Sequence, residues 1–322
     1  MYLSVKISIG KIRFESINRV DINSTWRRFT QTAKVWIPKA IYYRRDGKRH
    51  PVTNIRDFIK VGDRVKIELG YNGLLATEFE GYVAYSPKLT IPYEIECEDE
   101  MWVLKQKEVN ISLGDASVKE IIEAVAPGYE IECADEYYGD FSLLKTTPVK
   151  VFDELKQTSG IHTFFRGNRL IVGKPYSDPK IDKTVKKYVF GHNILNNTLS
   201  YRDSEEVNVK VYGSSLQPDG TIIRAEAGND GGNVIRREIP GRTKEQLDKD
   251  VQLIQDDERN FSRYVGTITS FGFPVVRHGM VVNVVDELYE KGRDTKHYIE
   301  EVNVWCSPEE GYRRMVKLGK DA

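Results

Sequence analysis

Gly62-Asp63-Arg64-Val65-Lys66-Ile67 and Gly279-Met280-Val281-Val282-Asn283-Val284 are two stretches of this 322-residue chain that follow one pattern. In each, apolar residues stand three and five positions after a glycine, which is the period-two spacing of a half-buried β-strand. Residues of matching class follow both stretches. The first set comprises Gly62, Val65, Ile67, Phe79, Val83 and Tyr93, and the second comprises Gly279, Val282, Val284, Tyr298, Val302 and Tyr312. We interpret the two sets as copies of one all-β unit.

The spacing within the two sets supports this interpretation. The four-residue step from Phe79 to Val83 recurs from Tyr298 to Val302, and a tyrosine follows ten residues later in both sets. The gap before the aromatic residue differs by two residues, as a hairpin loop of variable length allows. The residues match in class more than in identity, so chance similarity is the alternative to duplication. A duplicated β unit favours a scaffold over an enzyme built around one pocket.

The composition is that of a globular protein of two or three domains. Hydrophobic residues make up 40% of the chain and charged residues 30%, which is an ordinary balance. Forty-eight basic and 48 acidic residues cancel, which argues against sequence-specific binding of nucleic acid, since such proteins carry a basic excess. The longest apolar runs are far shorter than the roughly 20 residues that span a bilayer, and no secretory signal is visible. We therefore expect no membrane partner and assembly in a cytoplasm.

Three regions follow one another along the chain. Residues 1–105 read as short alternating strands separated by turn signals, which predicts a first β-barrel domain. Residues 106–176 read as an α/β module with two helices, one capped by Asp115 or Ser117 and one beginning at Pro148. Residues 177–322 return to strands, with one helix at about 243–262. The predicted fold class is α+β, mainly β, with two similar antiparallel β-barrel domains and an inserted small α/β module.

No pattern in the chain predicts catalysis, a cofactor or a metal. The three cysteines form no CxxC pair, and no two of the five histidines have metal-ligand spacing. The glycine-rich segment 228–232 lacks the Lys-Ser/Thr of a phosphate loop. Two acidic triplets, at 98–100 and 256–258, are expected to be solvated charge. We expect a protein that is not an enzyme, with catalytic, cofactor and metal residues all absent.

One local charge concentration lies at Tyr42-Tyr43-Arg44-Arg45-Asp46-Gly47-Lys48-Arg49-His50. Aromatic residues beside arginines could stack on nucleic acid. The other interpretation is a solvent-exposed hairpin tip, and we favour it.

In the order and spacing of its segments, the chain resembles the late-control-D-like hub proteins of contractile phage tails. It is also similar to the hub portion of the valine-glycine-repeat spike proteins of type VI secretion. The segments that carry the likeness are Val35-Trp36-Ile37-Pro38, Gly62–Ile67 with Phe79–Val83, Thr147–Gly173, Gly272-Phe273-Pro274, and Gly279–Val282 with Tyr298–Val304.

This resemblance implies a homotrimer in which two barrels per subunit form a six-fold-like ring. Such a ring would match a hexameric tail-tube protein on one face and a trimeric spike protein on the other, among other baseplate proteins. The chain ends at Ala322 without a glycine-rich needle and carries no lysozyme-like segment. The resemblance therefore implies a separate spike, no lytic activity, and a place in a virion tail, baseplate or injection particle assembled in a bacterial cytoplasm.

Two other classes of function stay open. A β-rich glycan-binding or adhesin module would suit the 18 tyrosines and the exposed loops. A cell-wall or polysaccharide hydrolase is the third class, although the sequence offers no residues for it.

Overall fold

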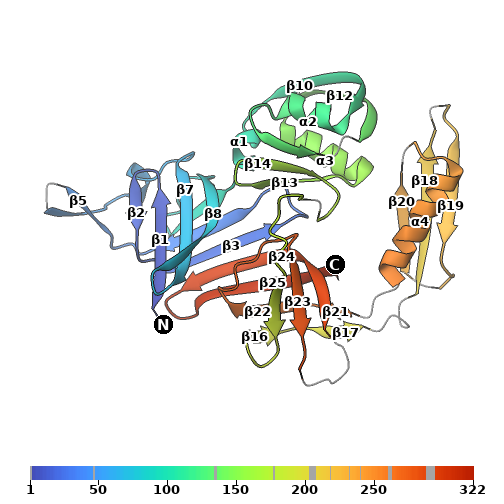
Figure 1. The fold of residues 1–322 in the computed structure, drawn as a ribbon. Coiled ribbons are helices and arrows are strands. Elements are labelled where there is room, and N and C mark those ends of the chain that lie inside the picture. The colour runs from blue at the N-terminus through green and yellow to red at the C-terminus, as the bar shows by residue number, and fades with distance from the viewer. Residues whose placement is uncertain are drawn as a thin grey trace.

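The computed structural model describes residues 2–45, 48–133, 136–176, 178–202, 208–217, 219–231, 233–239, 241–259, 263–287 and 294–322. Strands make up 52% of the chain and helices 14%, so the fold is mainly β. Figure 1 shows a broad sheet with an α/β module above it and a second small α/β unit set apart from both.

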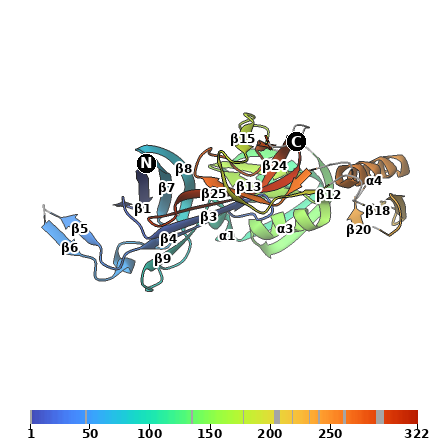
Figure 2. The same ribbon diagram turned by 90° about the horizontal axis from the view of Figure 1, so that it is seen from below.

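The first half of the sheet comes from the N-terminal region. Its strands are β1 (Leu3–Ile9), β2 (Ile12–Phe14), β3 (Arg19–Thr25), β4 (Thr32–Ile37), β7 (Arg64–Tyr71), β8 (Leu74–Val83) and β9 (Tyr93–Glu98). The strands β5 (Tyr42–Arg45) and β6 (Lys48–Pro51) form a separate hairpin beyond this half of the sheet. The 3-10 helix η1 (Ile55–Asp57) follows the hairpin. Figures 1 and 2 show the hairpin projecting from one end of the molecule.

The second half of the sheet comes from the C-terminal region. Its strands are β15 (Lys186–Val189), β16 (Ile194–Asn197), β22 (Thr267–Phe271), β23 (Val281–Val285), β24 (Thr295–Ser307) and β25 (Gly311–Asp321). A separate short pair, β17 (Ser200–Arg202) and β21 (Arg263–Val265), lies beside it. Antiparallel pairing dominates, although β15 runs parallel to β23.

The two halves form one continuous sheet, because β3 pairs with β24. The register runs from Val20 opposite Cys306 to Thr25 opposite Glu301. The thirteen strands follow the order β16-β22-β25-β24-β3-β4-β9-β8-β7-β1-β2, with β23 and β15 branching from β24. Among the described residues no pairing closes either half, so the prediction of two closed barrels is wrong. The outer strand of the first half, β3, pairs with β24, which lies inside the second half between β25 and β23.

A single hydrophobic core lies across this join. It contains alternate residues of the first half, such as Ile7, Ile67 and Val83, and of the second, such as Val284 and Val316. Burial of every second side chain follows from the strand period. The predicted boundary between 1–105 and 177–322 therefore separates two segments that share one core.

The central module has its own core and matches the predicted module in its helices. It contains α1 (Met101–Lys105), β10 (Val109–Ser117), α2 (Val118–Val125), β11 (Glu130–Cys133), β12 (Tyr137–Thr146), α3 (Pro148–Ser159), β13 (His162–Arg166) and β14 (Arg169–Gly173). Ser117 caps α2 through a capping box with Glu120, and Pro148 begins α3. Phe164 and Ile171 pack with Trp26 of the first half.

A distal unit accounts for the predicted third-region helix. Its elements are β18 (Val209–Leu216), β19 (Ile222–Ala227), β20 (Asn233–Glu238) and α4 (Lys244–Arg259). The helix expected at about 243–262 is α4, and residues 260–262 lie outside the described part of the chain. Leu247 and Val251 pack α4 on its own three-stranded sheet. Figure 2 places this unit at the end opposite the β5–β6 hairpin.

Candidate functional site

The two glycines that open the repeated sets adopt the same backbone geometry. Gly62 has φ +87° and Gly279 has φ +86°, a left-handed conformation that favours glycine. The Gly62 N–H donates to the Val83 carbonyl at 2.9 Å, and the Gly279 N–H donates to the Ile299 carbonyl at 2.8 Å. Both bonds lie just before the start of a strand, β7 or β23, and tie it to the neighbouring strand, at the last residue of β8 or at the fifth residue of β24.

These hydrogen bonds make Ile299 the structural counterpart of Val83, three residues before the Val302 that the sequence pattern matched to it. The same displacement recurs on the facing strand: Ile67 faces Phe79, but Val284 faces Thr295, which lies three residues before Tyr298. Val302 lies on the join between the halves, opposite Ser24. The shared geometry therefore covers the glycine and the strand that follows it, and duplication of a longer unit stays a prediction.

The remaining members of the two sets lie in strands of the sheet. Those that are buried in the shared core are Val65, Ile67, Phe79, Val83, Tyr93, Val282, Val284, Val302 and Tyr312. Tyr298 is half-buried and stacks on Tyr176, with ring centroids 4.6 Å apart.

A buried polar network connects the two halves. The Arg314 guanidinium lies 2.6 Å from the Glu78 carboxylate, and the Tyr312 hydroxyl donates to the same carboxylate at 2.5 Å. Arg314 also donates to the carbonyls of Gly272 and Val276. Burial raises the pKa of Tyr312, so its hydroxyl is a donor. Because a buried charge is costly without its partner, Glu78 of β8 and Arg314 of β25 hold each other in place.

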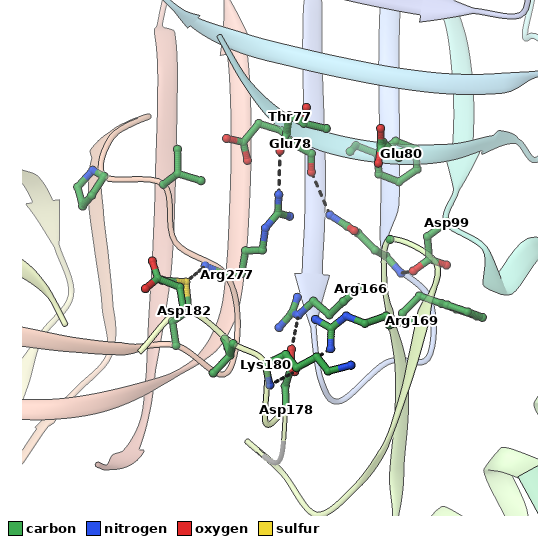
Figure 3. Close-up of a pocket in the computed structure, with 18 of the residues that line it drawn as sticks. Thr77, Glu78, Glu80, Asp99, Arg166, Arg169, Asp178, Lys180, Asp182 and Arg277 are labelled. Atoms are coloured by element: carbon green, nitrogen blue, oxygen red, sulfur yellow. Dashed lines mark hydrogen bonds and ion pairs between the residues drawn. The ribbon is translucent and has the colours of Figure 1, made fainter. Parts of the chain in front are cut away.

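A charged cleft of about 760 Å³ lies where four segments meet. The segments are β8, the turn between β13 and β14, the strap 178–186 that follows the module, and the segment 273–280. Figure 3 shows Arg166 and Arg169 above Asp178, with Arg277 reaching toward Thr77. This cleft is our candidate binding site.

Arginines dominate the inner wall of the cleft. The Arg166 Nε atom lies 3.6 Å from the Asp178 carboxylate, and an Arg169 nitrogen lies 3.3 Å from the other oxygen. Arg166 also donates to the His278 carbonyl. Arg277 donates to the Thr77 carbonyl at 2.8 Å. The pKa of Arg166 is lowered to about 9, mainly by burial and secondly by repulsion from Arg277.

His278 lies beneath these arginines and is neutral. Its Nδ1 atom lies 2.9 Å from the Ser24 hydroxyl. Burial, and then repulsion from Arg166, hold its pKa well below the usual range. Its ring packs edge-on against Phe164 of β13, with centroids 4.7 Å apart, so His278 supports the packing of the module turn.

The acidic triplet at 98–100 is buried, so the prediction that it is solvated charge is wrong. Glu98 pairs with Lys105, and Glu100 pairs with Arg64. Asp99 accepts the backbone N–H groups of Gln31 and Met101, and burial raises its pKa to about 7. These carboxylates fasten α1 to the sheet. In the other triplet, the side chains of residues 257 and 258 lie outside the description.

Two further absences apply to the described residues. No group of three His, Cys, Asp or Glu side chains lies close enough to hold a metal ion. No helix in the described ranges is long and apolar enough to cross a membrane.

Sequence reasoning missed the arginines of the cleft. Arg166 and Arg169 flank the Gly167-Asn168 turn, which was recognisable as a turn. Arg277 comes from a distant segment, and only the tertiary structure brings it to them.

Solved structures with the same fold are phage tail proteins and related components. No protein-family model and no curated protein matches the chain. A tail protein from Neisseria meningitidis MC58 is 12% identical, with a TM-score of 0.70, over 100% of this chain and 97% of that one. The 43 kDa tail protein of prophage MuSo2 from Shewanella oneidensis is 14% identical, with a TM-score of 0.66, over 98% of each chain.

A third similar structure is the c3393 protein of Escherichia coli, a component of the type VI secretion system. It is 10% identical, with a TM-score of 0.55, over 98% of this chain and 77% of that protein. At these identities the likeness is one of fold. Over its full length, this chain therefore has the fold of phage tail proteins, and of a type VI secretion component related to them in structure.

Proposed function

We propose that this chain is a non-enzymatic structural hub of a phage tail or a phage-like contractile injection apparatus. In this role it is a trimeric adaptor between a hexameric tail tube and a trimeric spike, in contact with other baseplate proteins. It would act in a virion tail, baseplate or injection particle assembled in the bacterial cytoplasm. The full-length likeness in fold to phage tail proteins is the observation that carries the proposal.

The arrangement of the sheet supports the adaptor role. One chain presents two halves, and a glycine with the same φ and the same hydrogen bond opens a strand in each. Three copies of a chain with two related halves present six related edges, which suits a six-fold partner on one side and a three-fold partner on the other. The repeated sets that begin at Gly62 and Gly279 would then serve symmetry matching.

The experiment has two arms. Light scattering on the purified chain should give three times the chain mass of 37.0 kDa. Immobilised chain should then retain both the tail-tube protein and the spike protein encoded near its own gene, while an unrelated β-rich protein retains neither. A chain that stays monomeric at high concentration and binds neither protein would contradict the proposal.

A further inference from the structure

We infer that the charged cleft binds an acidic peptide segment of a partner protein, with a carboxylate of that segment held by Arg277. The inference goes beyond the hub role and does not depend on it, because it rests on the charges and the walls of the cleft alone.

Positive charge exceeds the negative charge available to it on the inner wall. Arg166 and Arg169 share the carboxylate of Asp178, whose side chain is 3% exposed, and Arg169 also lies 3.9 Å from the Glu132 carboxylate. Among the described residues no carboxylate pairs with Arg277. Arg277 is half-buried, and a charge that is partly removed from water gains from an opposite charge beside it. Arg277 repels the neighbouring Arg166 guanidinium, and a carboxylate bound to Arg277 would relieve this repulsion.

The other carboxylates that line the cleft already have partners. Glu78 pairs with Arg314, Glu80 lies 3.3 Å from Lys66, and Asp182 lies 3.4 Å from Lys186. Asp99 accepts two backbone N–H groups. Lys180 adds no free charge, since it pairs with Glu130 and Glu132. Asp178, Glu130 and Glu132 together balance Arg166, Arg169 and Lys180, so the net positive charge lies at Arg277.

Arg277 is placed to bind a carboxylate. Its guanidinium carries five N–H donors, and one of them bonds the Thr77 carbonyl. This bond fixes the side chain without neutralising it. A guanidinium fork matches the two oxygens of a carboxylate in a way that an ammonium group does not.

The walls favour a peptide over a free inorganic anion. Phe79, Phe165, Ile181, Phe273 and Met280 line the cleft together with the arginines. Phe273 packs against the rings of Tyr71 and Tyr312 and still leaves 39% of its surface exposed. A volume of about 760 Å³ lies within the range of ligand sites in proteins. Alternating apolar and acidic side chains would satisfy both kinds of wall.

The test uses the full chain and a fluorescein-labelled hexapeptide of alternating leucine and glutamate. Its counterpart has glutamine in place of glutamate. Fluorescence anisotropy should show the glutamate peptide binding at least tenfold more tightly. Arg277→Gln should remove this preference, and Arg277→Lys should keep part of it because the charge stays while the fork is lost.

Arg56→Gln is the matched control. Arg56, like Arg277, uses its guanidinium to donate to a backbone carbonyl, that of Pro87, but it lies outside the cleft. This variant should bind both peptides as the unmodified chain does. Circular dichroism verifies the fold of each variant, and Arg277→Lys serves as the cleft variant if Arg277→Gln does not fold.

Four results would overturn the inference: equal binding of the two peptides, no binding of either, equal weakening by Arg56→Gln, or binding of inorganic phosphate in place of the peptide. Peptide affinity that rises on dilution of the chain would mean that a second copy fills the cleft, and would overturn it as well.

Discussion

Gly272 occupies a position where any side chain would collide with the buried network. A Cβ atom built on it would lie 2.0 Å from the ring of Tyr312. That ring is buried, and its hydroxyl is tied to Glu78. The ring therefore cannot move away without breaking the bond between the two halves of the sheet.

Gly272→Ala should consequently destabilise the protein. Overpacking of a tight core costs about 1–3 kcal/mol, and the loss of the Tyr312–Glu78 bond would add to it. Gly114→Ala is the control, because the nearest atom to its Cβ would be an Asp140 carboxylate oxygen at 3.6 Å. Denaturant unfolding should give a lower midpoint for Gly272→Ala and a nearly unchanged one for Gly114→Ala. Equal midpoints would contradict the role assigned to Gly272.

Asp99 should give the protein a distinctive dependence of stability on pH. Burial raises the pKa of this carboxyl to about 7, above its value of about 4 in an unfolded chain. Between these two values the folded state binds more protons than the unfolded state, so the free energy of unfolding falls as pH rises. The slope from one such group is at most about 1.4 kcal/mol per pH unit.

The Asp99→Asn variant isolates this effect. An amide cannot accept the N–H groups of both Gln31 and Met101, so the variant should be less stable at acid pH, where the unmodified chain is protonated at this site. Its stability deficit should shrink as pH rises from about 4 to about 7. Unfolding free energies measured across this range test the expectation, and parallel profiles for the two proteins would refute it.

At the scale of the elements, the sequence predicts best what local contacts decide. Ser117 and Pro148 mark the starts of α2 and α3 by chemistry confined to one helical turn, and both helices begin there. The helix expected from about residue 243 has a local start as well, since the Thr243 hydroxyl accepts the Gln246 N–H. The elements that packed as expected are therefore those whose signals lie within a few residues.

Pairings between distant segments are what the sequence could not supply. Strand patterning identifies β3 and β24 as strands but does not choose their neighbours, and their pairing replaces two predicted barrels with one sheet. The distal unit was missed for a related reason, because a helix and three strands carry no signal of whether they share a core with the rest. The cleft combines both limits, since Arg277 meets Arg166 only through the packing of the module on the sheet.

At the scale of the whole molecule, the common core predicts a common opening. Since residues of β7 and β22 belong to or flank one core that crosses the β3–β24 join, the halves should unfold together. Hydrogen exchange at rising denaturant should give the same opening free energy for amides in 64–71 and 267–271. The α4 amides provide the contrast, because the distal unit has a separate core and should open at its own lower free energy. Two distinct values for β7 and β22 would contradict the single core.

The 13-residue strand β24 pairs with β25 along one edge, and along the other with β23 near its start and β3 farther on. A force along β24 loads all of these ladders at the same time. Antiparallel hydrogen bonds lie perpendicular to the strand, so such a force shears them. Rupture then requires many bonds to fail in shear, whereas peeling breaks them one after another. An axial load applied to one half would therefore pass to the other through the β3–β24 ladder.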